Sequence, residues 1–396
     1  MLRFLTAGES HGPALSVIVE GLPAGLAVSV DEIADELARR RLGYGRGPRM
    51  RFERDELRLT GGVRHGRTLG SPVAIEIANT EWPKWESEMA STPGVPERRL
   101  TQPRPGHADL AGMQKYGFDD ARDVLERASA RETAARVVAG SLAKSLLATL
   151  GVAIVSHVTR IGAAALPEGM RPRPEDLARI DDDEVRCLNP ATSAAMVAEI
   201  KAAAKEGDSL GGVAEVIGYD VPVGLGSHVH WDRKLDGLLA GALMSIPAVK
   251  AVEIGDGLAL AAQRGSVAHD SIVREDASAR TGGYVRASDH AGGLEGGITS
   301  GAPLIARVAM KPLSTLNRPV LATVDVDTGE STLAFKERTD VVAVPALGVI
   351  AESMMAWVVA SESLRKFGGD SVAEFARNAC AVREHLRDTP SGPRPR

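Results

Sequence analysis

The sequence is poor in cysteine: among 396 residues only Cys187 and Cys380 occur, far apart in the chain. Their separation matches no zinc-ligand spacing, and two thiols do not make a disulfide framework. Reduced thiols are typical of the cytoplasm, which is the compartment that we expect. No metal ion is expected either. His228 and His230 could ligate one, but no third ligand lies near them at a familiar spacing.

Long hydrophobic runs and an excess of positive charge are also absent. No stretch approaches 18 uninterrupted apolar residues, and the opening segment MLRFLTAGESHG lacks the apolar core of a signal peptide. We therefore expect a soluble protein with no membrane span and no targeting segment. The formal net charge of -5 argues against a general nucleic-acid binder, whose surface would be basic.

Arginines are nevertheless concentrated in the segment RRRLGYGRGPRMRFERDELR, residues 39–58. Local positive charge on an acidic protein favours a small anionic ligand over a polymer. Glycines alternate with Arg46 and Arg49 in this segment, but the spacing fits neither a dinucleotide fingerprint nor a P-loop. The segment can therefore be interpreted as a phosphate- or carboxylate-binding loop or as a solvated loop.

The stretch from Arg104 to Thr133 contains the motifs RPGHAD and RASARET. A Pro-Gly bend directly before His107 would present the imidazole from a rigid turn. Arg127 and Arg131 are four residues apart, so on a helix both guanidinium groups would share one face. A histidine beside two fixed cations suits an anionic substrate that needs a proton moved. The alternative is a turn histidine and a solvated helix face.

A second histidine, His11, lies in the turn 8–13 between two predicted strands, walled by glycines and a proline. Such a turn lets backbone and side chains approach a ligand closely. Capping boxes predict helix starts at Ser29 and Ser371, and apolar spacing predicts helices over 189–206 and 344–359.

Three further segments could contact a ligand. Five glycines fall between Gly292 and Gly301, which indicates backbone packed against a flat or phosphorylated ligand, or simply a run of turns. The segment KPLST, residues 311–315, follows a predicted strand and offers an ammonium group and two hydroxyls. Arg338 and Asp340 precede the predicted helix at 344, as a structural salt bridge or as a base held ionised.

Together and in this order, these motifs closely resemble the chorismate synthase family. The resemblance spans nearly the whole chain. The matching segments are GESHG (8–12), RRxGYGRGxRM (40–50), GVRHGRTLGSP (62–72), RPGHAD (104–109), RASARET (127–133), GDSLGG (207–212), MSIPAVKAVEIGDG (244–257), AGGLEGG (291–297), KPLST (311–315), RTDVVAVPA (338–346) and FGGDS (367–371).

The resemblance implies an α+β fold in a single domain over residues 1–388. The tail over 389–396 is rich in Pro and Arg, and we expect it to be disordered. The domain is expected to be a β-α-β sandwich, with two antiparallel sheets around central helices, assembled as a homotetramer. Length alone would have favoured two or three domains.

The resemblance also implies the reaction. The family catalyses a 1,4-anti elimination of phosphate and a ring hydrogen from 5-enolpyruvylshikimate 3-phosphate, giving chorismate. Reduced FMN is required although the reaction is redox-neutral overall, and NADPH is a candidate electron source. We expect a separate flavin reductase to supply the reduced flavin. Two alternatives from other classes stay open: a flavin reductase that consumes NADPH, and a non-catalytic binder of phosphorylated metabolites.

The family's functional residues carry over to matching positions. His11 would protonate the departing phosphate, His107 would protonate the flavin ring near N1, and Asp340 would help to remove the C6 proton. Substrate contacts fall at Ser10, Arg40, Arg46, Arg49, Arg104, Arg131 and Arg338. Flavin contacts fall at Arg127, Ala128, Ser129, Pro247, Ala248, Gly296, Lys311, Pro312, Leu313, Ser314, Thr315 and Arg338. Arg40 and Arg46 also match the family's NADPH-associated arginines.

The sequence departs from the family pattern at two places. Asp289 and His290 stand where many relatives have Asn before the AGG motif, which adds a negative charge near the flavin glycines. Pro247 and Ala248 stand where some members carry Gln-Ala, so we expect this flavin contact to come from the backbone.

Overall fold

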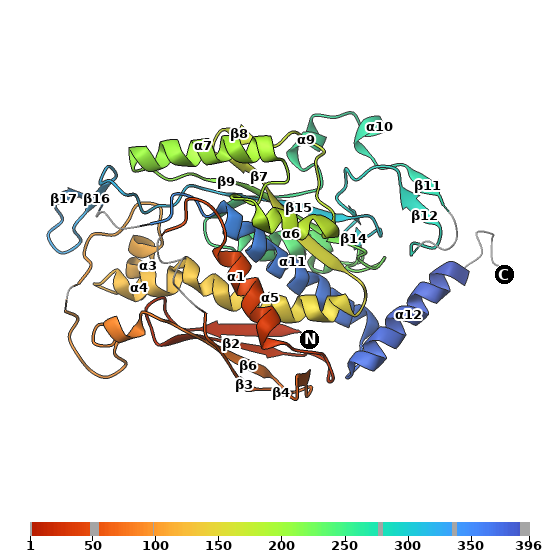
Figure 1. Cartoon of the computed structure of the whole chain (residues 1–396), viewed down its shortest axis with the longest axis horizontal. Helices are drawn as coiled ribbons and strands as arrows, with labels where there is room; N and C mark the ends of the chain where they lie inside the picture. Colours follow the sequence, from red (N-terminus) through yellow and green to blue (C-terminus); the bar gives the residue numbers. More distant parts are fainter. Residues whose placement is uncertain (1, 48–54, 98, 276–279, 335–338, 389–396) are drawn as a thin grey trace.

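The computed structural model describes residues 2–47, 55–97, 99–275, 280–334 and 339–388. Two antiparallel sheets dominate it (Figure 1). The first has the strand order β1-β2-β6-β3, formed by β1 (Arg3–Ala7), β2 (Ala14–Glu20), β6 (Val73–Ala78) and β3 (Leu57–Gly61). The second has the order β10-β15-β9-β7-β8, formed by β10 (Val249–Ile254), β15 (Leu304–Met310), β9 (Gly212–Tyr219), β7 (Ala153–Ile161) and β8 (Ala164–Ala165).

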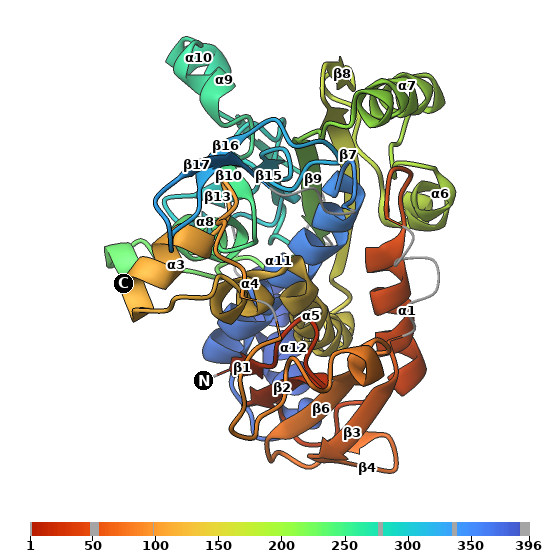
Figure 2. The same cartoon turned by 90° about the vertical axis from the view of Figure 1, so that its left-hand side faces the viewer.

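Two long helices, α5 (Thr133–Ala148) and α11 (Val344–Phe367), lie between the sheets (Figures 1 and 2). Helix α5 contacts β2 of the first sheet, α11 packs on β7 and β9 of the second, and the two helices pack on each other. By length and composition α11 could cross a membrane, but 89% of its most apolar stretch is buried inside the protein. It is the central core helix.

The main hydrophobic core draws on both sheets and on the helices between them. Leu15 of β2, Leu142 of α5, Val359 of α11 and Val216 of β9 belong to one buried cluster, and each is at most 1% exposed. The alternation of buried and less buried residues along β6 is the pattern of a strand that packs one face against such a core.

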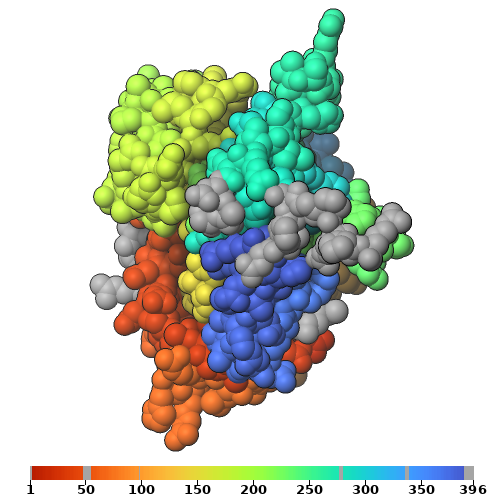
Figure 3. Space-filling model, turned by 90° about the vertical axis from the view of Figure 1, so that its right-hand side faces the viewer, coloured from red at the N-terminus to blue at the C-terminus, as the bar shows by residue number. Residues whose placement is uncertain are grey.

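Shorter elements surround these layers. The remaining helices are α1 (Val30–Arg41), α3 (Asp109–Tyr116), α4 (Arg122–Ala128), α6 (Leu177–Asp182), α7 (Pro190–Glu206), α8 (Leu235–Met244), α9 (Leu258–Ala261), α10 (Gly265–Ala268) and α12 (Val372–Asp388). Short 3-10 turns are η1 (Trp82–Lys84), η2 (Ala130–Glu132), η3 (Pro174–Asp176) and η4 (Trp231–Arg233). Two-stranded ribbons pair β4 (Val63–Arg64) with β5 (Arg67–Thr68), β11 (Ile272–Arg274) with β12 (Tyr284–Arg286), β13 (Leu294–Glu295) with β14 (Ile298–Thr299), and β16 (Ala322–Val324) with β17 (Ser331–Leu333). The α9–α10 segment projects beyond the rest of the surface (Figure 3).

Local sequence signals located most helix ends correctly. The Ser29 side chain accepts from the backbone N–H of Glu32 at 3.2 Å and begins α1. The box formed by Ser371 and Glu374 is likewise present at the start of α12. Helix α7 ends at Gly207, whose φ of 71° is the left-handed cap that glycine favours. Helix α11 ends at Phe367, inside the KFGGDS segment (366–371) whose glycines predict a helix end there.

The prediction that Arg127 and Arg131 share one helix face is wrong. Helix α4 ends at Ala128, and Ser129 is extended, with a ψ of 144°. The Ser129 side chain instead accepts from the N–H of Arg131 and starts η2. Because the chain turns at Ser129, the two guanidinium groups reach different parts of the structure.

Candidate functional site

His11 is held by a buried carboxylate. Both its backbone N–H and its Nδ1 bond to Glu126 of α4, at 2.9 Å and 3.0 Å. Glu126 is 3% exposed. Its burial would raise the pKa of this carboxyl, but the hydrogen bonds from His11 and the charge of Arg122 outweigh that effect and lower it. The structure therefore holds an ionised acceptor behind His11.

An aromatic ring covers His11 from a second direction. Trp85, just after η1, stacks on the imidazole with ring centroids 4.1 Å apart. The Arg122 guanidinium lies 4.9 Å from the Trp85 ring centroid and donates to Glu126 at 3.0 Å. The sequence analysis missed both Glu126 and Trp85. The only sequence signal for Glu126 is its place directly before the RASARET motif, four residues after Arg122.

Residues of the RASARET motif support the turn that carries His11. The Ser129 hydroxyl donates to that of Ser10 at 3.2 Å, and Ser10 itself is buried. Arg127 donates to the carbonyl oxygens of Thr6 and Gly8, both at 3.0 Å. Ala128 is the last residue of α4 beside them. The motif thus fastens the end of β1 and the turn after it.

Arg131 extends this group through an asparagine that the sequence analysis also missed. Its Nε donates to Asn79 Oδ1 at 3.0 Å, and its Nη1 pairs with the buried Asp55. The Asn79 amide donates to the carbonyl of Gly12 at 2.7 Å, so it links Arg131 to the His11 turn. Arg40, 4% exposed at the end of α1, reaches Thr133 at the start of α5.

His107 has a buried carboxylate of its own. Asp109 is fully buried, bonds to His107 Nδ1, and pairs with Arg104 Nε at 2.8 Å. Burial would raise the pKa of Asp109, but the bonds from His107 and Arg104 hold it well below its ordinary value. The RPGHAD motif therefore supplies an imidazole, a guanidinium group and the carboxylate that orients both.

The KPLST segment lies against the His107 turn, as a loop after β15. The Lys311 ammonium donates to the carbonyl of Gly106, and Thr315 accepts from Arg104 Nη1 at 3.1 Å. The backbone N–H of Lys311 donates to the carbonyl oxygen of Ala248, a residue with a φ of 65°. Pro247 precedes it in the turn between α8 and β10, and the Leu313 carbonyl accepts from Ser209. Pro312 and Ser314 complete the loop.

Asp340 pairs with the glycine- and arginine-rich loop after α1. Its Oδ2 lies 3.0 Å from Arg46 Nε, and the N–H of Gly47 donates to Oδ1. The loop also packs closely against Ile200 and Val342. Glycine at position 45 permits this, because a Cβ there would lie 2.7 Å from Ile200 and 3.2 Å from Val342. The predicted site residues Arg49 and Arg338 lie outside the described residues.

The remaining predicted positions lie in turns farther along the chain. Gly296, with a φ of 58°, forms the turn between β13 and β14. His290 pairs with Asp256 at 2.6 Å, and Asp270 accepts from the N–H of His290. Burial raises the pKa of Asp289. Asp256 and Asp270 therefore hold His290 in the turn at residues 289–290, where the sequence departs from the family pattern.

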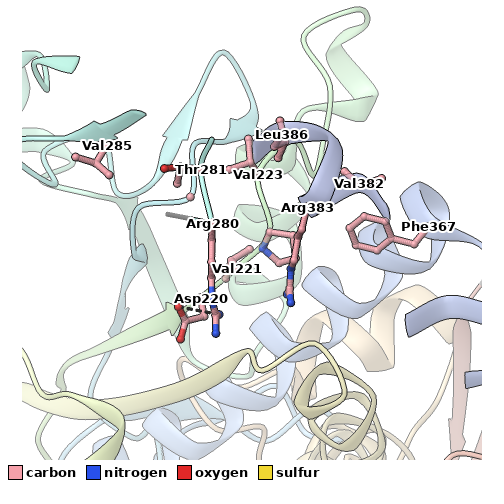
Figure 4. A pocket seen from close by; sticks show the side chains of 12 residues that line it. Asp220, Val221, Val223, Arg280, Thr281, Val285, Phe367, Val382, Arg383 and Leu386 are labelled. Carbon is pink, nitrogen blue, oxygen red and sulfur yellow. Dashed lines mark ion pairs between the residues drawn. The ribbon is translucent and has the colours of Figure 1, made fainter. Parts of the chain in front are cut away.

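A separate cavity of about 360 Å³ is lined by α12, by the loop after β9 and by residues around the start of β12 (Figure 4). Apolar side chains form its walls, and Arg280, paired with Asp220 at 2.8 Å, lies at its edge with Arg383. No described member of the predicted site lines it.

The arrangement suits proton transfer to an anionic substrate. Each of His11 and His107 bonds through Nδ1 to a buried carboxylate, which orients the opposite ring nitrogen for acid–base work. Arginines lie beside both rings. Among the described residues no group of three or more His, Cys, Asp or Glu could hold a metal ion.

Comparisons with known proteins agree with the resemblance. Residues 2–364 match the sequence profile of the family described as chorismate synthase. A chorismate synthase of Micrococcus luteus is 60% identical over 97% of this chain and 94% of its own. One from Salinispora tropica is 60% identical over 98% and 99%. A crystal structure of a chorismate synthase superposes with a TM-score of 0.78 at 39% identity, covering 98% of both chains.

Proposed function

Because this chain belongs to the chorismate synthase family, it catalyses the family's elimination, and we propose which of its residues perform it. The reaction removes phosphate from 5-enolpyruvylshikimate 3-phosphate to give chorismate, and it depends on reduced flavin. The substrate is a small molecule with a phosphate and two carboxylates. The observation that carries our assignment is that two histidines are each backed by a buried carboxylate beside arginines.

We assign the acid for the departing phosphate to His11. Its Nδ1 is engaged by Glu126, so Nε2 is the nitrogen that exchanges a proton with the phosphate oxygen. Ser10 and Arg131 stand in the same hydrogen-bonded group and bind the anionic substrate with Arg40 and Arg104. Asp340 is the base that removes the C6 proton, and its ion pair with Arg46 at 3.0 Å orients the carboxylate. Arg49 and Arg338 complete the proposed substrate set.

The residues around His107 fit a flavin phosphate. The Lys311 ammonium and the Ser314 and Thr315 hydroxyls stand on one loop, and a Cβ at Gly106 would lie only 3.4 Å from Lys311 Nζ. We propose that this loop, with Pro312 and Leu313, holds FMN together with Pro247, Ala248, Gly296, Arg127, Ala128, Ser129 and Arg338. The chemistry that bound reduced flavin would supply there is electron density for the substrate as phosphate leaves. His107, oriented by Asp109, is the acid–base group beside it.

We further propose that NADPH is the ultimate reductant and that a separate flavin reductase passes its electrons to the flavin. Arg40 and Arg46 match the family's NADPH-associated arginines, but under this proposal they bind the substrate. We propose that residues 1–388 form one domain, a β-α-β sandwich, and the hydrophobic core that the two sheets share among the described residues supports this. We propose a homotetramer as well, on the family resemblance; the exposed side chains of Trp231, Leu258 and Ile272 are apolar surface that subunit contacts would cover. Two free cysteines support a cytoplasmic protein.

The stoichiometry of electrons tests the function. In a reductase each product molecule consumes a hydride equivalent, whereas in the elimination reduced flavin is regenerated in every turnover. One charge of reduced FMN, sealed from oxygen, should therefore support many turnovers. Phosphate released is measured against reducing equivalents consumed. If one phosphate is released for each reducing equivalent consumed throughout the assay, the result would favour a reductase and contradict the synthase assignment.

The two histidines test the site. Replacing His11 or His107 by Ala should lower turnover about 10²–10⁴-fold, the usual range for a lost acid or base. Folding should change little, because both lie in turns outside the main core. Steady-state phosphate release and thermal unfolding measure the two effects. Near-wild-type rates in both variants would contradict the assigned roles.

A further inference from the structure

Glu126 bonds to both the backbone and the imidazole ring of His11. Oε2 accepts from the backbone N–H of His11 at 2.9 Å, and both carboxylate oxygens lie 3.0 Å from Nδ1 of its ring. The backbone N–H of Ser10 also donates to the Glu126 carbonyl at 3.0 Å. One glutamate on α4 thus fixes the backbone and the ring of the histidine across 115 positions of sequence.

The glutamate is itself held in place. Arg122, one helical turn earlier, donates to Oε1 at 3.0 Å and lies against the Trp85 ring, with Nε 3.3 Å from Glu88. Trp85 in turn stacks on His11, whose side chain is 18% exposed. Arg122 therefore contacts both the carboxylate that bonds to His11 Nδ1 and the indole that stacks on the ring.

We propose that Glu126 is a positioning residue, and that it sets the tautomer and the orientation of His11, with Trp85 fixing the plane of the ring. This rests on the proposed role of His11 as the acid. A carboxylate only accepts hydrogen bonds, so it selects a proton on Nδ1. In the acid form Nε2 carries a second proton. That proton passes to the departing phosphate oxygen, and the ring is left as the Nδ1–H tautomer that Glu126 accepts.

The tautomer of His11 in the unmodified protein is the first test. Nitrogen-15 NMR of histidine-labelled protein, with His11 identified by comparison with His11→Ala, distinguishes Nδ1–H from Nε2–H in the neutral ring. The proposal requires Nδ1–H. If neutral His11 is the Nε2–H tautomer, the proposal is overturned without any change at Glu126.

The second test is Glu126→Gln. One amide oxygen cannot accept from the His11 backbone, His11 Nδ1 and Arg122 together, so the tautomer preference should be lost. By analogy with other residues that orient a functional histidine, kcat should fall about 10–100-fold, with KM changed much less. A matched control is Glu215→Gln. Glu215 is also buried and lies 3.3 Å from His157 Nε2, outside the proposed site, so that variant should keep wild-type kcat.

The double variant separates this proposal from the proposed function. If Glu126 acts through His11, adding Glu126→Gln to His11→Ala should lower kcat no further. An equal additional loss would show that Glu126 acts independently of His11 and would overturn the positioning role. If His11→Ala lowers kcat but Glu126→Gln keeps the wild-type kcat, the positioning role of Glu126 is also overturned, and His11 remains the proposed acid. If His11→Ala keeps the wild-type kcat, the proposed role of His11 itself is refuted.

Discussion

Among single residues, the proposed site depends on two carboxylates, Glu126 and Asp55, that no sequence motif predicted to be functional. Glu126 and Asp55 are acidic residues inside or beside arginine-rich segments, where a sequence gives no way to tell a solvated charge from a buried one. Both are almost completely buried and contact a predicted site residue. Buried carboxylates stay ionised only when donors surround them, and those donors are the site's own histidine and arginine side chains.

Asp340→Asn tests the proposed base. The amide keeps an oxygen for the N–H of Gly47 but cannot take a proton or pair with Arg46. Turnover should fall about 10²–10⁴-fold while the protein still binds FMN. Phosphate release and a flavin titration measure the two properties. Asp220→Asn, which breaks the Asp220–Arg280 pair beside the separate cavity, is the control and should keep full turnover. Loss of FMN binding in Asp340→Asn would make Asp340 a structural residue.

At the scale of elements, the close approach of α5 and α11 decides the geometry between the sheets. Gly140 of α5 faces Ser353 of α11, and an added Cβ at Gly140 would lie 2.2 Å from the Ser353 Cβ and 2.5 Å from its Cα. Only glycine allows this crossing. Because Thr133 at the start of α5 contacts Arg40, the position of α5 also affects the proposed substrate site.

Gly140→Ala should therefore force the two helices apart. Overpacking of a core costs about 1–3 kcal/mol, and here the obstacle includes backbone, so we expect the upper end of that range. Gly241→Ala on α8 is the matched control. No atom lies within 4 Å of its added Cβ, so the better helix propensity of alanine should stabilise it by about 0.5–1 kcal/mol. Denaturant unfolding of both variants gives the comparison, and a Gly140→Ala variant as stable as wild type would refute the packing argument.

At the scale of the whole molecule, one buried charge cluster joins the layers. Glu352 of α11 is fully buried and accepts from Arg39 of α1 and Lys144 of α5, both at 2.7 Å. Ser156 of β7 donates to it at 2.6 Å, and Arg186 at 3.2 Å. Burial would raise the pKa of Glu352, but these cations hold it well below its ordinary value.

Glu352→Gln should lower the free energy of unfolding by about 3–5 kcal/mol, because it leaves buried cations without their counter-charge. A carboxyl whose pKa is lower in the folded state stabilises that state above its unfolded pKa of about 4, and the contribution is lost as pH falls below this value. The wild type should therefore lose stability on acidification more steeply than the variant. Urea unfolding between pH 3 and 7 measures both slopes. Glu295→Gln, at an exposed pair with Arg286, should cost less than about 1 kcal/mol. Equal slopes for Glu352→Gln and wild type would contradict the role of Glu352.

Several helix ends, the turns that carry His11 and His107, the strands on either side of the His11 turn, and the family could all be predicted from the sequence. Capping boxes, glycine ends and short motifs act over a few residues, so they can be read locally. Tertiary structure alone decided which charges meet. Arg127 and Arg131 diverge because Ser129 leaves the helix, and Glu126 meets His11 because α4 packs against the turn after β1. Such pairings join residues more than a hundred positions apart, and only packing can bring them within hydrogen-bond distance.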